Sequence, residues 1–449
     1  MKLGPFNITF GTRQAAPLIT RRFDGASGGR RGNGVGTFGP INSEVAAAGS
    51  TLRSRSRHLV QNNSLIANGV RNLATAMTGA GIMPTPMHPD AETRAALMTA
   101  WRAWSDEADA DGRTDLSGIE AQVARALIVD GEALLQVIRT DEGPRIRHIP
   151  VELLGETMCR PTEGGYIFSG VEFNATGQRI AYHIFPARAD HFQTYAQPIR
   201  VPADEILHIF EPLAAGQVRG IPWMASIILP ASELDQMTDA LLVGAKVAAM
   251  MAGFIINSND TGGGDPFDGQ DMPSLEPGTL QRLPGGTDIK FSTPQQAQQT
   301  GEFVKAQIRS LAAGLGIPAH WLDCDLSGAN YSSLRAGLLP VRARLEQVQY
   351  LTLVPQMLNP IWREFVEHTA ITGDFPGYEN DPQAALAVEW LPPVFMQVDP
   401  MKQVQADIAE LEAGLTSRRK LVASRGWSLE DLDAERAAEA ATAPKKESV

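Results

Sequence analysis

The run ASELDQMTDALLVGAKVAAMMAGFII, residues 231–256, constrains the fold of this chain more than any other stretch. Its apolar or small residues recur at alternating steps of three and four, which is the spacing of a heptad seam. The seam residues are Leu234, Met237, Leu241, Gly244, Ala248, Met251 and Ile255. Small residues also flank the seam, whereas a helix on the surface of a globule needs only one apolar stripe. We therefore expect a helix over 231–256 that packs between other helices, with Ser232 as its N-cap.

Composition and charge limit what the rest of the chain can do. Of its 449 residues, 43% are hydrophobic and 20% are charged, which is typical of a globular protein. The formal net charge of −12 argues against a chain built as a whole to neutralise phosphates. The two cysteines cannot form a disulfide framework and indicate a reducing compartment. Lys246 lies close to the centre of the long apolar run, so we expect no membrane span.

The first half of the chain divides into an arm, three helices and a group of strands. Residues 1–45 are rich in Gly, Arg and Ser and predict an arm that is flexible or folds against a neighbour. A helical pattern follows from Thr51 and is interrupted at Asn62 and Asn63. Further helices are expected over 91–110 and from a cap at Ser117 or Gly118, where Glu120 has capping-box spacing; a switch to strand is left open in the later part of the third helix. Residues 145–215 alternate apolar and polar positions, which predicts short strands in a small mixed sheet with a hairpin turn near Asn174 to Gly177.

The second half is predicted to be largely helical. A glycine-rich acidic insertion over 257–294, with a strand around 279–283, is followed by a helix over 295–315. A polar stretch then leads into a helix from Ser333 to about His368. Pro340 and Pro355 are expected to kink or break this helix, because proline removes a backbone donor. The final helices are expected over 400–441, separated near Gly414.

Ser332 and Ser333 are the candidates for a nucleophile. They follow His320, Asp323 and Asp325, so a hydrolase can be imagined. No G-x-S-x-G elbow is present, however, and nothing in the sequence places a base at a serine oxygen. Capping of the following helix explains the two serines better.

The sequence also offers no motif for a metal, a nucleotide or a cofactor. The spacing of the acids around His320 matches no common metal site. Neither a G-x-x-x-x-G-K-[ST] loop nor a G-x-G-x-x-G after a strand occurs. Trp101 and Trp104 are expected in a helical core rather than on a base-stacking platform. We therefore expect an interaction protein, with no catalytic, cofactor or metal site.

Three blocks of the chain resemble, in the same order, recurring blocks of lambda-type tailed-phage portal proteins. They are LRSRSRHLVQNNSLIANGVRNLATAMTGAGI from Leu52, GQVRGIPWMASIILPASELDQMTDALLVGAKVAA from Gly216 and GIPAHWLDCDLSGANYSSLRAGLL from Gly316. The similarity spans about residues 45–370. It implies a predominantly helical α+β fold of the portal type, with wing, stem, clip and crown regions around a central channel. It also implies a homo-oligomeric ring, dodecameric in the assembled head, at one vertex of the capsid.

The resemblance assigns regions by matching position. They are a flexible N-terminal arm (1–45), a wing (46–230), two stem helices (231–256 and 295–315) on either side of a clip (257–294), a tunnel-loop region (316–333), a kinked helix returning to the wing (334–399), and a crown with an acidic tail (400–449). The heptad seam would pack the stem. The clip residues expected to dock a terminase or an adaptor are Asp260, Asp265, Phe267, Asp268 and Arg282.

The polar stretch is interpreted as a shaped loop that faces DNA in the channel. Its residues are Asp325, Ser327, Asn330, Tyr331, Ser332, Ser333 and Arg335. In this interpretation Pro340 bends the following helix away from the channel. We expect Arg335 to pair with a neighbouring subunit rather than with DNA.

Partners and location follow from the same resemblance. The implied partners are the terminase large subunit, the major capsid protein, head-completion or adaptor proteins, and double-stranded DNA that passes through without sequence specificity. The implied locations are the portal vertex of the virion and, during assembly, the host cytoplasm. Two alternatives remain open. One is a different ring-forming capsid connector or scaffold, and the other is a metal-dependent hydrolase with carboxylates among Asp323, Asp325, Glu389 and Asp399.

Overall fold

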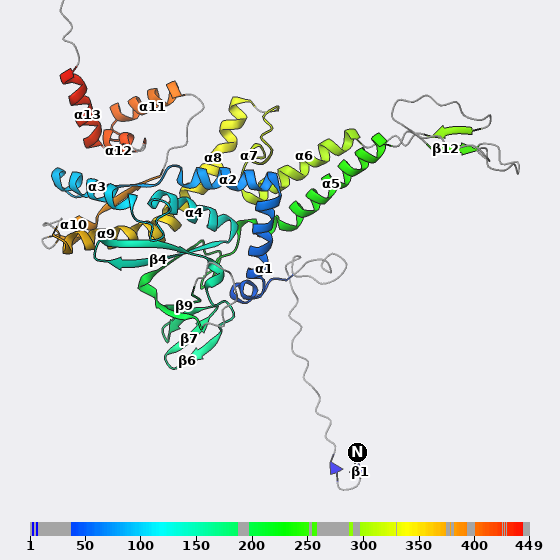
Figure 1. Ribbon diagram of the computed structural model, residues 1–449, viewed down its shortest axis with the longest axis horizontal. Helices are drawn as coiled ribbons and strands as arrows, with labels where there is room; N and C mark the ends of the chain where they lie inside the picture. The colour runs from blue at the N-terminus through cyan, green and yellow to red at the C-terminus, as the bar shows by residue number, and fades with distance from the viewer. Residues whose placement is uncertain are drawn as a thin grey trace, which may run out of the picture.

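The computed structural model has an elongated body from which two helices project to one side (Figure 1). The described residues are 2–3, 6–7, 37–186, 197–250, 254–257, 287–290, 297–328, 330–373, 378, 381–392, 400–423, 425, 427 and 429–442. Helices predominate among them, and every sheet that they form is antiparallel. The predicted strand at 279–283 lies outside the described residues.

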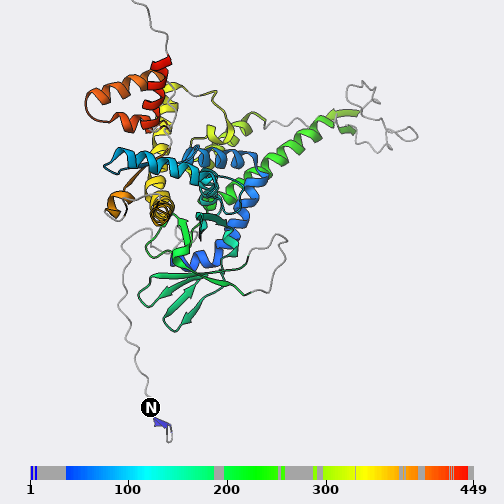
Figure 2. The same cartoon turned by 60° about the vertical axis from the view of Figure 1, so that its left-hand side comes forward.

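Apart from α1, which runs down alongside the sheets, the helices of the body lie on one side of them (Figures 1 and 2). They are α1 (Ile41–Asn62), α2 (Ser64–Thr78), α3 (Ala91–Asp106), α4 (Leu116–Val129), α7 (His320–Asp323), α8 (Tyr331–Val348), α9 (Asn359–Ile371) and α10 (Pro382–Leu386). Short 3₁₀ turns are η2 (Val151–Leu153), η3 (Ala203–Glu205) and η4 (Trp223–Ser226). Helix α1 begins at Ile41, earlier than the predicted start at Thr51, with Glu44 in its first turn, where a carboxylate is favourable.

Two sheets form the strand part of the body. The three-stranded sheet has the order β11-β4-β5, with β11 (Ile206–Phe210), β4 (Glu132–Thr140) and β5 (Gly143–Ile149). The five-stranded sheet has the order β10-β9-β8-β7-β6, with β10 (Ile199–Pro202), β9 (Arg179–Ile184), β8 (Val171–Asn174), β7 (Gly165–Phe168) and β6 (Arg160–Thr162). The predicted mixed sheet is therefore wrong, because short hairpin connections of this kind join antiparallel strands. Two-stranded pairs join β3 (Met83–Pro86) to β14 (Val388–Leu391) and β1 (Lys2–Leu3) to β2 (Phe6–Asn7).

Aromatic rings fill the part of the core between α3 and α9. The ring of Trp101 lies 5.1 Å from that of Trp362, 5.1 Å from Phe365 and 4.9 Å from Trp104, measured between centroids. Trp390 of β14 closes the cluster at 5.9 Å from Trp101. Trp104 donates its indole N–H to a backbone oxygen at 2.8 Å, so its polar atom is satisfied. The predicted core position of Trp101 and Trp104 is confirmed.

Polar caps set several element boundaries. Asn63 separates α1 from α2, and its side chain accepts the backbone N–H of Ile66 at 3.1 Å, which confirms the predicted interruption. The hairpin turn near Asn174 is also confirmed, because the Asn174 side chain accepts the N–H of Gln178 at 2.9 Å. Helix α4, by contrast, is capped by Asp115 and not by Ser117 or Gly118. The Asp115 carboxylate accepts the Gly118 N–H at 2.8 Å, and the chain does switch to strand after α4.

Residues Tyr331 to Ile371 form one continuous helical run that passes through both prolines. Pro340 lies inside α8, and Pro355 lies in a π-helical segment, η5 (Gln349–Leu358). The run was predicted to kink or break at the two prolines, and it does not break. At Pro355 the wider π turns accommodate the missing donor. Gln356 exchanges two hydrogen bonds with the backbone of Phe210, at 2.9 and 3.1 Å, and Gln349 donates to the Met77 carbonyl at 2.6 Å. These side chains fasten η5 to the body.

Three further groups of elements lie outside the body. The projecting helices are α5 (Ile228–Met250) and α6 (Ala297–Leu315), and β12 (Phe254–Asn257) pairs with β13 (Thr287–Lys290) beyond them (Figure 1). Helices α11 (Pro400–Glu412), α12 (Arg418–Ala423) and α13 (Leu429–Thr442) form a C-terminal unit at the other end (Figure 2). None of the helices in the described ranges has the length and apolar content needed to cross a bilayer.

Glu120 is a fully buried carboxyl group in α4. Its side chain accepts the Ile82 N–H at 2.7 Å instead of forming the predicted capping box. Burial raises the pKa of Glu120 to about 8. The native state therefore holds a proton that the unfolded chain releases above its ordinary pKa of 4.5.

The free energy of unfolding should consequently fall as the pH rises from 4.5 towards 8, by about 1.4 kcal/mol per pH unit from this group alone. We expect Glu120→Gln to remove that part of the slope while it keeps an acceptor for Ile82. Urea unfolding of the parent and the variant at pH 5 and pH 8 measures the difference. Glu142→Gln, at an exposed carboxyl, is the matched control, and equal slopes in parent and Glu120→Gln would contradict the assignment.

Candidate assembly and channel surfaces

Among the described residues, the buried side chains of α5 and α6 lie near the ends of the two helices that join the body. Ala231 and Leu234 of α5 are buried in the main core. On α6 the buried residues are Ile308, Leu311, Ala312 and Leu315. Helix α5 begins at Ile228 and not at the predicted Ser232 cap, because Pro230 is tolerated in the first turn of a helix.

The outer part of α5 exposes apolar side chains in several directions. Leu241, Leu242 and Val243 are 40%, 54% and 49% exposed. Successive residues on a helix point about 100° apart, so these three side chains cannot all face α6. Gly244 has no atom within 4 Å of the position a Cβ would take, and Phe303 on α6 is half exposed. This is an apolar surface that the described part of the chain leaves uncovered.

The predicted seam is therefore only partly present as a packed stripe. Leu234 is buried and Met237 half-buried, whereas Leu241 and Gly244 are exposed. Ala248 lies in α5, and Met251 lies outside the described residues. Ile255 is not on the helix: it lies in β12, opposite Ile289 of β13. The predicted helix over 231–256 was thus too long, because the run from Phe254 to Ile256 contains residues that favour strands.

The polar stretch before α8 is shaped by its own side chains. Asp323 accepts the N–H of Asp325, and Asp325 accepts the N–H of Ser327, each at 2.9 Å. Asn330 caps α8 by accepting the Ser333 N–H at 2.8 Å, and Ser333 accepts the Asn330 N–H at 3.0 Å. This is a reciprocal capping box, so the cap is Asn330 and Ser333 is its partner.

The short helix α7, which precedes the stretch, is held by α2, and the stretch itself is exposed to solvent. Asn68 and Asn72 of α2 donate to the carbonyl of Trp321, at 3.0 and 2.9 Å. Ser332 and Arg335 are exposed at the start of α8, and Tyr331 is its first residue. Burial of α8 begins at Val341, directly after Pro340. The first turns of α8 therefore carry the polar residues away from the body.

Charges of both signs meet beside this stretch. A hollow of about 320 Å3 lies between α6, α7 and α8, and Lys305, Arg309, His320, Asp323 and Asp325 are among its lining residues. Lys305 Nζ lies 3.6 Å from the carboxylate of Asp325. The side-chain and backbone hydrogen bonds from Ser327 lower the pKa of Asp325. The carboxylate is thus kept ionised, while Lys305 balances its charge.

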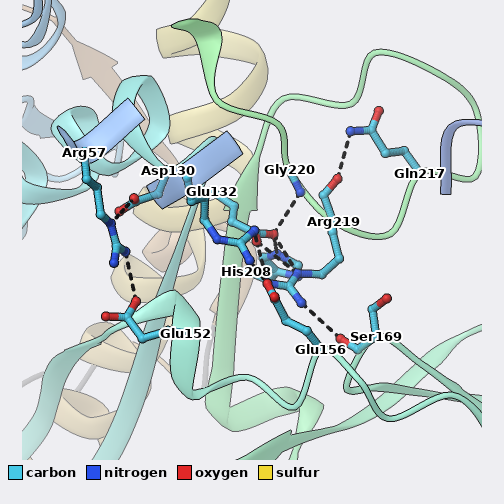
Figure 3. Close-up of polar contacts among 11 residues, drawn as sticks. Arg57, Asp130, Glu132, Glu152, Glu156, Ser169, His208, Gln217, Arg219 and Gly220 are labelled. Atoms are coloured by element: carbon cyan, nitrogen blue, oxygen red, sulfur yellow. Dashed lines mark hydrogen bonds and ion pairs between the residues drawn. The ribbon is translucent and has the colours of Figure 1, made fainter. Parts of the chain in front are cut away.

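A buried cluster of charged residues lies where α1, both sheets and the segment leading to α5 meet (Figure 3). Glu132 at the start of β4 is 0% exposed, and Arg219 is 3% exposed. Their side chains form two bonds, Arg219 Nη2 to Glu132 Oε1 at 2.6 Å and Nε to Oε2 at 2.9 Å. His208 of β11 and the Gly220 N–H contact the same carboxylate at 2.9 and 2.8 Å. Arg53 of α1 adds a second buried cation, at 3.5 Å.

The cluster also ties the five-stranded sheet to this corner. Arg219 donates to the Ser169 carbonyl and to Glu156, both at 3.1 Å. Although burial alone would raise the pKa of Glu132, the charge of Arg219 and the bond from His208 hold it below its usual range. A Cβ on Gly220 would lie 2.1 Å from the Gly131 carbonyl oxygen, so only glycine permits this close approach. The arrangement fixes the segment that leads into α5, at Arg219 and Gly220, relative to the sheets.

The sequence did not reveal this cluster. Glu132 and Arg219 are far apart in the chain and belong to no recognisable motif. The one available signal was Arg53, which lies on the apolar side of α1 between Gly49 and Leu59. A charge on that face indicates a buried partner, without saying which one.

Of the residues proposed for metal or hydrolytic chemistry, Asp323 and Asp325 lie together at the hollow beside α8, whereas Glu389 is in β14. Lys305 pairs with Asp325, whereas Glu389 pairs with Lys420 of α12 at 2.9 Å. Asp399 lies outside the described residues. Within the part of the chain that the structure describes, no group of three His, Cys, Asp or Glu residues could hold a metal ion.

The five clip residues lie outside the described residues. They are Asp260, Asp265, Phe267, Asp268 and Arg282. Strands β12 and β13 flank the segment that contains them. In the chain, β12 comes after α5 and β13 comes before α6.

Comparisons with known proteins give a consistent picture. The family model described as phage portal protein, lambda family, matches residues 29–349. The probable portal protein of Halomonas phage phiHAP-1 is 23% identical over 449 residues, covering 93% of this chain and 85% of its own length. The portal protein of Escherichia phage N15 is 24% identical over 478 residues, covering 93% and 89%. A chain from the neck of an empty GTA particle has a TM-score of 0.50 at 16% identity, covering 88% of this chain and 96% of its own, which shows a shared fold.

Proposed function

Because the chain belongs to the lambda family of phage portal proteins, we propose that its copies close side by side into a ring at one vertex of a capsid. The ring, dodecameric in the assembled head, surrounds a channel through which double-stranded DNA enters during packaging and leaves during ejection. The large terminase subunit docks on the outer end during packaging, and head-completion or adaptor proteins occupy that end afterwards. The major capsid protein surrounds the ring.

The uncovered apolar surface of α5 carries this proposal. Leu241, Leu242 and Val243 point in different directions, so one partner helix cannot cover them all. In a closed ring each α5 has a neighbouring copy on both sides, because the contact between copies is heterologous. Both exposed sides of the helix would then be buried.

The regions follow from this arrangement. Helices α5 and α6 form the stem, and residues 257–294 at their outer end form the clip that meets the terminase. The body from 46 to 230 forms the wing, and the C-terminal unit forms the crown. The buried cluster around Glu132 holds the stem at a fixed angle to the wing.

The wall of the channel is proposed to guide DNA without chemistry. The net charge of −12 gives the ring little attraction for phosphates, so DNA can slide. The loop from Asp325 to Ser333 is held in one shape by its Asp and capping-box bonds. We assign this loop to the channel lining, with Arg335 directed to the adjacent copy.

Replacing Asn330–Ser333 by a glycine-serine linker should leave rings intact and reduce the DNA packaged per particle. The linker removes the capping box, which is worth about 1 kcal/mol per cap, and frees the loop. Electron micrographs measure ring formation, and nuclease-protected DNA measures packaging. A glycine-serine pair in place of the exposed Glu163 and Gly164, in the turn between β6 and β7, is the matched control. Normal packaging by the linker variant would refute the role of the loop.

The ring itself is tested on the purified protein. Particle mass and electron microscopy should show an annulus with a central hole, and an assay with divalent metals should show no hydrolysis. Single chains at high concentration and in lysates that contain capsids would exclude the proposal. A small oligomer that hydrolyses substrate would favour an enzyme instead.

A further inference from the structure

The C-terminal unit contains an open apolar groove. It measures about 340 Å3, and its apolar lining residues include Val404, Ile408, Leu411, Leu421, Val422 and Leu432. Ile408 and Leu411 are both about half exposed. In the isolated chain, the described residues leave this groove facing solvent.

The residues of α11 along the groove have the spacing of a helix contact. Met401, Val404, Ile408 and Leu411 are exposed and follow one another at steps of three, four and three. Such a stripe packs against one side of another helix. The groove is therefore shaped for a helix.

Helix α13 offers a surface that matches the groove. Ala434, Ala437, Ala438 and Ala441 are exposed and spaced as neighbours on the helix surface. Side chains of this size let two helix axes approach to the short end of the usual 8–10 Å range. Residues 434 to 441 are all exposed in one copy, although Ala438 and Glu439 also take part in interactions within the chain.

Charge favours the same pairing. Arg418 and Arg425 line the groove, and their side chains are 43% and 55% exposed although each already has a carboxylate partner within the chain. Glu435 is exposed on α13, close to the alanine stripe. An acidic helix entering a groove with arginines on its rim is electrostatically complementary.

We propose that residues 434–441 of α13 of one copy lie in this groove, between α11 and α12 of the next copy and beside the first turn of that copy's own α13. The pairing makes a second ring contact apart from the stem. The inference rests on the proposed ring, because only side-by-side copies repeat a heterologous contact until it closes. The contact would join the C-terminal units on the side of the body away from the sheets (Figure 2).

Cross-linking between singly substituted chains tests the contact. In a full-length background with Cys159→Ser and Cys324→Ser, one protein carries Ile408→Cys and the other Ala438→Cys. The two are mixed, assembled and oxidised. A disulfide needs Cα atoms within about 7 Å, and in this mixture it can form only between chains. We expect a species at twice the chain mass of 48.4 kDa, absent from either protein alone.

Ala406→Cys mixed with Ala438→Cys is the matched control, because Ala406 lies on the opposite face of α11 from the stripe. Val404→Cys serves as a second probe of the groove in case Ile408→Cys disturbs the unit. Rings without a cross-link above the control at either position would overturn the inference and leave the proposed function standing. A cross-link in a protein that forms no ring would support the contact and count against the proposed function. Neither rings nor cross-link would overturn both.

Discussion

Leu241→Asp is expected to give a folded single chain where the parent forms a ring. The side chain is exposed in one copy, so the substitution removes no contact within the chain. In the ring it would lose apolar burial worth about 1.5–3 kcal/mol at each contact. It would also bury a carboxylate without a partner, which costs several kcal/mol more. These losses recur at every interface of the ring.

Particle mass and thermal unfolding together measure this result. The mass should fall to that of the chain, 48.4 kDa, while the unfolding of the body stays cooperative. Leu213→Asp is the matched control, because Leu213 is an exposed leucine in the segment between β11 and η4 and belongs to neither α5 nor α6. Rings of normal mass from Leu241→Asp would show that the outer part of α5 is not an interface.

Glu132→Ala should lower the free energy of unfolding by about 3–5 kcal/mol. The substitution leaves Arg219 and Arg53 buried without their shared carboxylate. It also leaves the Gly220 N–H without an acceptor. Arg219 and Arg53 are then left to share Glu156, a carboxylate that is 28% exposed, so most of the cost of taking two cations out of water is no longer compensated.

Urea unfolding of the purified protein measures this loss. Glu152→Ala is the control, because Glu152 pairs with Arg57 at 2.9 Å but is about half exposed. A pair of that kind contributes at most about 1 kcal/mol. Similar losses in the two variants would mean that the Glu132 cluster contributes no more to the free energy of unfolding than a half-exposed ion pair does.

The sequence predicted the features that depend on local pattern. The family, the predominantly helical α+β class, the break at Asn63 and the turn at Asn174 are confirmed. The break and the turn each have a cause within a few residues, namely a cap and a turn residue, whereas the family was indicated by three blocks in the same order. Trp101 could be placed in the core because a large aromatic ring on a helix is rarely left in water.

The features that the sequence missed depend on competition between neighbouring residues for the same role, or on contacts between residues far apart in the chain. Asp115 displaced Ser117 as the cap of α4, and Pro230 was accepted inside α5. The end of α5 was placed too late because the heptad spacing continued, by coincidence, into the strand that holds Ile255. The partnership of Glu132 with Arg219 arises only when β4 and the segment before η4 are folded together. The positions assigned to the clip and to the channel loop stay predictions.

The hydrogen bonds that fasten η5 to the body have a consequence for how the polar stretch before α8 can move. The helical run from Tyr331 to Ile371 is roughly 60 Å long at 1.5 Å per residue. The hydrogen bonds of Gln349 and Gln356 hold this run against the body, and side chains from Val341 onward are packed in the core. The turns of α8 from Ser332 to Pro340 have no buried side chain. Pro340 also has no N–H to donate to the backbone hydrogen bonds of the helix. A large movement of the loop would therefore require α8 to bend at Pro340. The loop and the first turns of α8 would then move together as one unit.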